Sequence, residues 1–123
     1  VTSGGVSVGD YDFVKRMLNE MGKMNVWKVA MRPGQPLAFG TISGKPLFGL
    51  PGNPVSSMVS FEQFVRPSIL KMSGHKNLFR PTLRAVLRED ISKKAGLVHF
   101  IRCLGSVSPN QIVLLPSGFS TRE

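Results

Sequence analysis

Residues 46–57 read PLFGLPGNPVSS, and this stretch decides the fold. Its apolar first half is short enough to be a buried strand. The Pro-Gly pair that follows marks a tight turn. Asn53 is a favoured helix N-cap, and Pro54 suits the first position of a helix. The stretch therefore predicts a strand, a tight loop and a helix in succession, as in an α/β layer.

The helix that begins at Pro54 is expected to run to about Met72, with Gly74 just past its end. Pro67 lies inside it, where a missing N–H and a bulky ring predict a kink. The apolar residues recur at helical spacing. One face of the helix is therefore expected to point towards the core, and it consists of Met58, Phe61, Val65, Ile69 and Met72.

Upstream of this helix, short apolar runs predict strands at 26–31 and 37–40. Ser43-Gly44 turns the chain back, so that 46–50 pairs with 37–40 as a hairpin. An earlier helix, which Asp10 or Asp12 can cap, is expected to end at Gly22. Its apolar face consists of Val14, Met17, Leu18 and Met21. We interpret the alternation of strands and helices as an α/β fold with a largely parallel sheet.

Beyond Gly74 the pattern changes. A polar, basic segment at 75–77 is followed by alternating apolar residues at 83–87 and 98–102 and by an apolar run at 112–115. We therefore expect a boundary near residues 74–79. The predicted parts are an α/β domain over 1–74 and a small β-rich domain, itself cut short, over 75–123.

Composition narrows the classes of function. Hydrophobic residues make up 41% of the 123 residues, which is enough for a core. The sequence has no apolar run of roughly 18 residues, the length that would predict a membrane span, and no signal segment is visible. Cys103 is the only cysteine, so an internal disulfide is excluded and a cytoplasmic location is expected. The formal charge of +9 favours an anionic partner, but the 8% aromatic content argues against nucleic-acid binding.

Three loops, each following a strand, are candidates for binding an anion. In the first, residues 3–12, glycines allow close approach of the backbone, and Ser3 and Ser7 offer hydroxyls. In the second, residues 32–36, stiff prolines preorganise the Arg32 guanidinium. In the third, residues 51–57, Ser56 and Ser57 are donors in the first turn of a helix. Taken singly, each loop is also compatible with an ordinary structural turn, a solvated Arg or helix capping.

Asp10 and Asp12 lie beside the first loop, where a carboxylate near bound phosphates can hold Mg²⁺. Helix capping is the alternative, and we favour it for Asp10. We expect structural roles for His99, which alternates with apolar residues, and for Cys103.

The order of the three loops resembles a known family. Residues 2–13 (TSGGVSVGDYDF), 31–39 (MRPGQPLAF) and 49–57 (GLPGNPVSS) are similar to signatures of the molybdopterin molybdotransferase family, which includes bacterial MoeA and the gephyrin E domain. The resemblance covers residues 1–74 and continues weakly through 80–102. It implies an enzyme of molybdenum-cofactor biosynthesis that takes molybdopterin-AMP and molybdate, releases AMP and leaves molybdenum on the dithiolene.

The resemblance also implies roles for individual residues. Asp12 matches the acidic residue for Mg²⁺ and adenylate cleavage, and Arg102 matches a basic residue from the β-rich domain. Around molybdate and the pterin phosphate the implied binding residues are Ser3, Gly4, Gly5, Ser7, Arg32, Gln35, Pro36, Asn53, Ser56 and Arg102. A homodimer is implied as well.

The sequence departs from the family pattern in places. Many relatives carry Lys where this chain has Arg32 and Gln35, so Gln35 loses one cation. Because the chain starts in the middle of a glycine-rich turn, we expect it to be a fragment that is inactive alone. The alternative functions are an adenylyltransferase-type pterin-binding domain, a non-enzymatic scaffold and a basic nucleic-acid module. Salt-dependent DNA binding would indicate the last of these.

Overall fold

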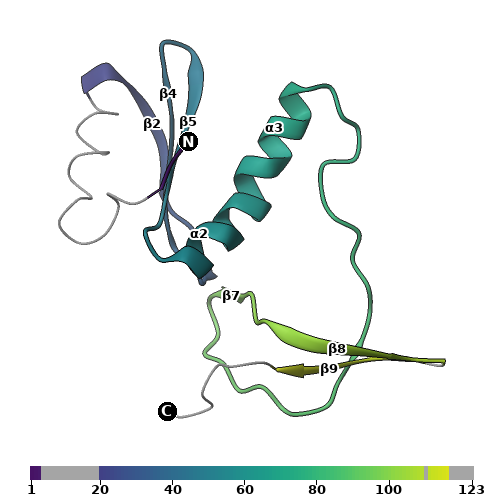
Figure 1. Ribbon diagram of the computed structural model, residues 1–123. Coiled ribbons are helices and arrows are strands. Elements are labelled where there is room, and N and C mark those ends of the chain that lie inside the picture. Colours follow the sequence, from purple (N-terminus) through teal and green to yellow (C-terminus); the bar gives the residue numbers. More distant parts are fainter. Residues whose placement is uncertain (4–19, 110, 117–123) are drawn as a thin grey trace.

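The computed structural model describes residues 1–3, 20–109 and 111–116 (Figure 1). In the first part of the chain a sheet with strand order β1-β5-β4-β2 is covered on one face by a long helix. The bounds of the sheet strands are β1 Thr2–Ser3, β2 Gly22–Lys28, β4 Pro36–Ile42 and β5 Lys45–Leu50. The predicted α/β class is confirmed.

The directions of the strands differ from the largely parallel sheet that we predicted. Among the described strands of this sheet, only β1 and β5 run parallel, whereas β5–β4 and β4–β2 are antiparallel. The predicted hairpin explains the difference. Ser43 (φ 49°) and Gly44 (φ 74°) both adopt positive φ, as a two-residue hairpin turn requires, and this forces β4 and β5 to run antiparallel.

The long helix has three consecutive parts, α2 Pro54–Ser60, a wide π-helical turn η1 Phe61–Val65, and α3 Arg66–Met72. Its ends agree with the sequence prediction. Asn53 is the N-cap, and Gly74 (φ 79°) follows the last turn. His75 N–H donates to Leu70 O (2.9 Å) and Gly74 N–H to Lys71 O (3.1 Å), the paired bonds of a Schellman motif.

A π-helical turn lies immediately before Pro67, where we expected a kink. Within it Arg66 N–H donates to Phe61 O, five residues back. Since Pro67 has no N–H to donate one turn back, the regular hydrogen-bond pattern is interrupted here, and the wide turn stands at this interruption.

The predicted apolar face of the helix is largely wrong, both before the wide turn and after it. Val65 is completely buried, but its predicted companions are exposed: Met58 71%, Phe61 37%, Ile69 43% and Met72 63%. The buried cluster instead consists of Leu37, Phe48, Leu50 and Val65, with Val29, Phe39 and Phe64 packed against it. Phe39 and Phe48 are direct partners across β4 and β5, with ring centroids 4.8 Å apart.

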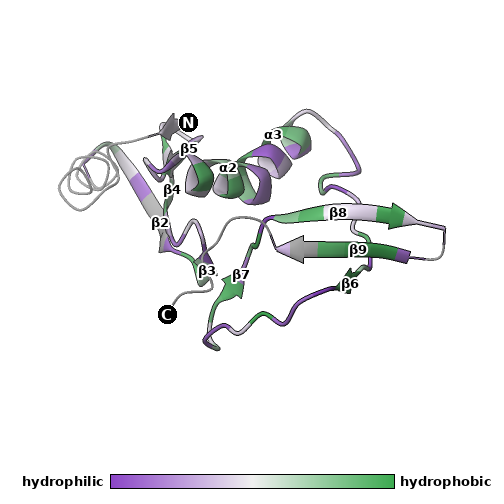
Figure 2. Cartoon of the chain, turned by 60° about the horizontal axis from the view of Figure 1, so that its bottom comes forward, coloured by the Kyte–Doolittle hydropathy of each residue, from purple (hydrophilic) through white to green (hydrophobic). Residues whose placement is uncertain are grey.

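After the helix an extended segment leads to the second group of strands. Its elements are β6 Val86–Leu87, β7 Val98–His99, β8 Cys103–Ser108 and β9 Gln111–Pro116. We had predicted strand structure in this region, but not β8 as a strand of its own. β6, β9 and β8 form a three-stranded sheet whose apolar residues stand out in Figure 2.

β7 does not join that sheet. It pairs in parallel with β3, Met31–Arg32, of the first part of the chain, and the two lie side by side in Figure 2. The two predicted parts are therefore linked by a strand pairing as well as by the segment after Gly74. None of the helices in the described part of the chain is long and apolar enough to span a membrane.

Candidate functional site

The first and third loops meet at one edge of the sheet. Thr2 pairs with Gly49 and Ser3 with Leu50, so the carboxyl ends of β1 and β5 lie together. There the hydroxyl oxygens of Ser3 and Ser57 are 3.2 Å apart, within hydrogen-bond distance. The carboxyl ends of parallel strands are where α/β sheets usually bind ligands.

Asn53 fixes the start of the helix at this edge. Its extended backbone (φ −67°, ψ 124°) lets Oδ1 accept from Ser56 N–H at 3.1 Å and from the Ser56 hydroxyl at 3.4 Å. Ser57 N–H donates to Asn53 O at 2.8 Å. The first turn contains no acidic residue, so no side chain of that turn offsets the positive end of the helix dipole.

The second loop packs against the same helix. Gly34 has a φ of 100°, and a Cβ atom at this position would lie 2.7 Å from Ser60 Oγ and 3.5 Å from Ser56 O. The loop also contains a cis peptide bond between Arg32 and Pro33, and Gln35 O accepts from Val29 N–H at 3.0 Å. Thus α2 contacts the first loop through Ser57 and the second through Ser56 and Ser60.

The side chains predicted on the second loop are accessible. Arg32 and Gln35 are exposed, and Pro36 is half-buried as the first residue of β4, a strand position that tolerates proline. Arg32 is therefore exposed on a loop whose Gly34 packs against the helix.

The β-rich part reaches the second loop through β7. Val98 N–H donates to Ala30 O (2.9 Å) and Phe100 N–H to Arg32 O (2.8 Å), which makes His99 the register partner of Arg32. His99 Nε2 is buried and has no hydrogen-bond partner among the described residues. Arg102, exposed, follows three positions later. The strand that leads to Arg102 is thus attached directly beside Arg32.

Several predicted residues lie outside the described part of the chain: Gly4, Gly5, Ser7 and Asp12. Within the described ranges, no three His, Cys, Asp or Glu side chains are grouped so as to hold a metal ion.

A cleft of about 370 Å³ opens where the first and third loops meet. Polar groups at its wall are Ser3, Ser57 and Glu62, and its apolar wall includes Leu50, Met58 and Phe61. The Glu62 carboxylate is already paired: Arg80 donates from Nε to Oε2 (2.8 Å) and from Nη2 to Oε1 (3.0 Å). This hydrogen bonding lowers the pKa of Glu62, so the carboxylate stays charged but compensated.

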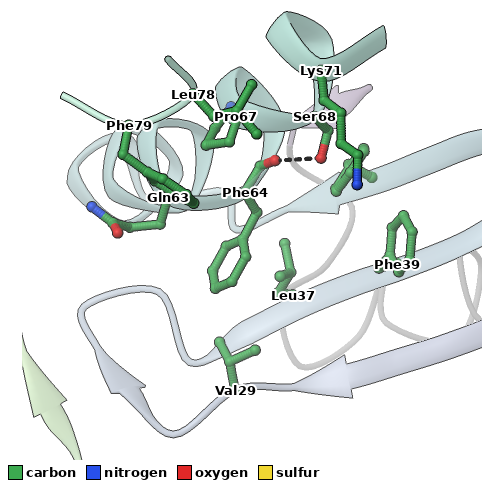
Figure 3. Close-up of a pocket in the computed structure, with 11 residues that line it drawn as sticks. Val29, Leu37, Phe39, Gln63, Phe64, Pro67, Ser68, Lys71, Leu78 and Phe79 are labelled. Atoms are coloured by element: carbon green, nitrogen blue, oxygen red, sulfur yellow. Dashed lines mark hydrogen bonds between the residues drawn. The ribbon is translucent and has the colours of Figure 1, made fainter. Parts of the chain in front are cut away.

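A second cavity, also of about 370 Å³, lies between the hairpin and the helix (Figure 3). Phe39, Phe64 and Phe79 line it, and its single charged side chain is Lys71. None of the predicted site residues takes part, so this cavity is an opening of the core and not the candidate site.

Three contacts went unpredicted: the Ser3–Ser57 hydroxyl pair, the packing of Gly34 on Ser60, and the β3–β7 pairing. The glycine after Pro33 signalled a close approach of the backbone, but its partner lies 26 positions away along the chain, from Gly34 to Ser60. Spacing along the sequence carries no information about such partners.

The fold is that of an α/β domain with an open cleft at the carboxyl ends of two parallel strands, the place where such domains bind ligands. More specifically, the chain belongs to the family described as the probable molybdopterin binding domain, whose profile matches residues 1–71.

Individual relatives agree with this assignment. The chain is 45% identical over 103 residues to a molybdopterin molybdenumtransferase of Haemophilus influenzae, covering 83% of this chain and 26% of that protein. It is 37% identical over 121 residues to the Staphylococcus aureus protein of the same name, covering 98% and 29%. The chain thus spans little more than a quarter of the length of these relatives.

The structure resembles the crystal structure of the molybdopterin biosynthesis moea protein from Pyrococcus horikosii. The TM-score is 0.58 at 26% identity, over 85% of this chain and 25% of the other.

Proposed function

We propose that the full-length protein inserts molybdate into adenylated molybdopterin with release of AMP, and that this chain supplies part of the pterin- and oxyanion-binding site. The observation that carries the proposal is the meeting of three loops on α2, through the 3.2 Å Ser3–Ser57 contact and the packing of Gly34 on Ser60. A tetrahedral oxyanion and a phosphate need fixed donors and cations, and the contacts of the loops with α2 support a site of that kind.

Each loop has its own task in this proposal. The exposed Arg32 guanidinium clamps an oxyanion through parallel N–H bonds, with Gln35 and Pro36 beside it. Asn53 and Ser56 bind a phosphate or oxyanion at the start of α2, where the Ser56 hydroxyl exchanges its 3.4 Å hydrogen bond to Asn53 Oδ1 for one to the ligand. Gly4, Gly5 and Ser7 continue the first loop, and Arg102 completes the site from the β-rich part.

Mg²⁺ is proposed as the cofactor, with Asp12 as a ligand together with substrate phosphates. The proposal rests on the family resemblance and on the preference of Mg²⁺ for one or two carboxylates plus phosphate oxygens. When bound, the ion would neutralise charge on the adenylate phosphates.

The test is a molybdate-dependent AMP-release assay on the full-length protein. Arg32→Ala is expected to weaken molybdate use more than binding of the pterin adenylate, and Asp12→Asn to slow AMP release while pterin binding survives. Arg84→Ala serves as control, because Arg84 is an exposed cation outside the three loops. If Arg32→Ala weakened molybdate use and binding of the pterin adenylate equally, Arg32 would have a structural role. Unchanged turnover of Asp12→Asn would reject the role of Asp12.

We further propose that the full-length protein is a cytoplasmic homodimer. The single cysteine suits a reducing compartment. The exposed Met58, Ile69 and Met72 leave apolar helix surface available for burial by another surface. Sedimentation of the full-length protein at twice the monomer mass would support the dimer, and a monomer at micromolar concentration would exclude it.

A further inference from the structure

Ser57 lies where the first and third loops meet, but it is not among the binding residues that the family resemblance implies. Its backbone N–H is used within the helix, where it donates to Asn53 O at 2.8 Å. Its hydroxyl leaves the helix and reaches Ser3 Oγ at 3.2 Å. By contrast, the Ser56 hydroxyl is directed back to Asn53 Oδ1 at 3.4 Å.

One of the two O–H groups in the Ser3–Ser57 pair is not used by the pair itself. Each serine carries one O–H donor and two acceptor lone pairs. Their mutual hydrogen bond consumes one of the two protons, so the other O–H is available to a third group. A hydroxyl that accepts one hydrogen bond becomes a better donor in the next, because hydrogen bonds in a chain polarise one another.

The surroundings of the pair are suited to an acceptor that carries negative charge. Ser3 is exposed and Ser57 half-buried, and both line the cleft of about 370 Å³ described above. The carboxylate in that cleft, Glu62, is held by Arg80 at 2.8 Å and has Arg66 3.9 Å away. Its charge is therefore compensated and does not exclude a second anion.

We propose that Ser57 is a further ligand-binding residue, which acts with Ser3 as one hydroxyl pair and donates a single hydrogen bond to a tetrahedral oxyanion. This inference rests on the proposed function and deepens it. Two sources supply such an oxyanion, molybdate and the phosphate of the adenylated pterin, and the chemistry of the hydroxyl pair is the same for both.

The test measures equilibrium binding of two probes, sodium molybdate and AMP, to the full-length protein by calorimetry. Ser57→Ala is expected to weaken the binding of at least one probe by about tenfold or more, the usual effect of removing a hydrogen bond to a charged group. The probe that is weakened identifies the source of the oxyanion. Ser57→Thr keeps the hydroxyl and is expected to restore binding to within about twofold of the wild type.

Two further variants complete the design. Ser73→Ala is the matched control, since Ser73 is an exposed serine at the other end of the same helix. The double variant Ser3→Ala/Ser57→Ala is expected to bind no more weakly than the poorer of the two single variants, because the hydroxyls act as one unit. Circular dichroism establishes that each variant is folded.

The outcomes separate this inference from the proposed function. If the wild type binds the probes and Ser57→Ala binds them equally well, the role of Ser57 is overturned and the proposed function is not. Strictly additive losses in the double variant overturn the paired action. A folded wild-type protein that binds neither probe overturns both the inference and the proposed function.

Discussion

Arg80 binds both carboxylate oxygens of Glu62 across 18 positions of the chain, at 2.8 and 3.0 Å. A second contact lies two residues earlier in the chain, where Arg66 of the helix donates from Nη1 to Leu78 O at 3.2 Å. The chain just after the helix, at the predicted boundary near residues 74–79, is therefore held against the helix on both sides of Phe79.

The first prediction concerns the ionisation of Glu62. Hydrogen bonding to Arg80 lowers the pKa of Glu62, and Arg80→Ala is expected to raise that pKa towards its ordinary value. Because the folded-state pKa is the lower one, the contribution to stability is present above the ordinary carboxylate pKa and lost as the pH falls through the lowered value. A carbon-detected NMR titration of the side-chain carboxyl measures this. An unchanged titration in Arg80→Ala, or an equal change in the control Arg84→Ala, would contradict the assignment.

The second prediction concerns Gly34. Gly34→Ala is expected to destabilise the protein more than Gly96→Ala, as measured by urea unfolding. Both glycines have similar positive φ, 100° and 97°, so both variants carry the cost of about 1–2 kcal/mol for a left-handed alanine. Only at position 34 does the new methyl group meet other atoms, Ser60 Oγ at 2.7 Å and Met31 Cε at 2.8 Å. Equal destabilisation of the two variants would mean that the second loop does not press on the helix.

The third prediction concerns Ser60, whose hydroxyl is fully buried and has no partner among the described residues. Removing an unsatisfied buried hydroxyl removes its desolvation penalty, of about 1–3 kcal/mol. Ser60→Ala is therefore expected to leave the free energy of unfolding unchanged or to raise it. A loss of more than about 1 kcal/mol would show that the hydroxyl has a partner after all.

The fourth prediction concerns the cap of the long helix. Asn53→Ala is expected to cost about 1 kcal/mol of stability, because Ser56 N–H loses the Oδ1 acceptor at 3.1 Å. Asn53→Asp keeps an acceptor and should retain most of the stability. Thermal unfolding compares the two variants with Asn77→Ala, an exposed asparagine beyond the helix. The cap would be ruled out if Asn53→Ala and Asn77→Ala unfolded alike.

Local signals predicted the ends of the long helix and the hairpin correctly. Asn53, Pro54 and Gly74 act through their own backbone preferences, and those preferences do not depend on distant parts of the chain. The same holds for Ser43-Gly44, whose positive φ values determine the hairpin turn.

The face of the helix was not predictable from periodicity. The prediction assumed 3.6 residues per turn from Met58 to Met72, and the wide turn at Phe61–Val65 shifts the phase of the residues that follow it. Met58 precedes this turn and is exposed as well, so the shift accounts only for the residues after Val65. Val65 stayed buried, whereas Ile69 and Met72 moved to the surface. Spacing between residues predicts a face only while the helix remains regular.

Of the candidate site, the sequence predicted which loops would carry polar groups, but not how they touch. The positions of Asn53 and Ser56 at the start of the helix follow from capping. The contact of Ser57 with Ser3 depends on the parallel pairing of β1 with β5, across 54 positions. The roles of Gly4, Gly5, Ser7 and Asp12 stay predictions.

The pairing of β3 with β7 bears on the order of events during folding. Met31 and Val98 lie on opposite sides of the whole helix in the sequence, and closing such a distant contact costs chain entropy before it gains any stability. The hairpin and the helix need only local contacts and can form first. Arg32 would then acquire its neighbour from the β-rich part as a late step, so premature arrest of folding would leave an intact first sheet and helix in which β3 has no paired strand.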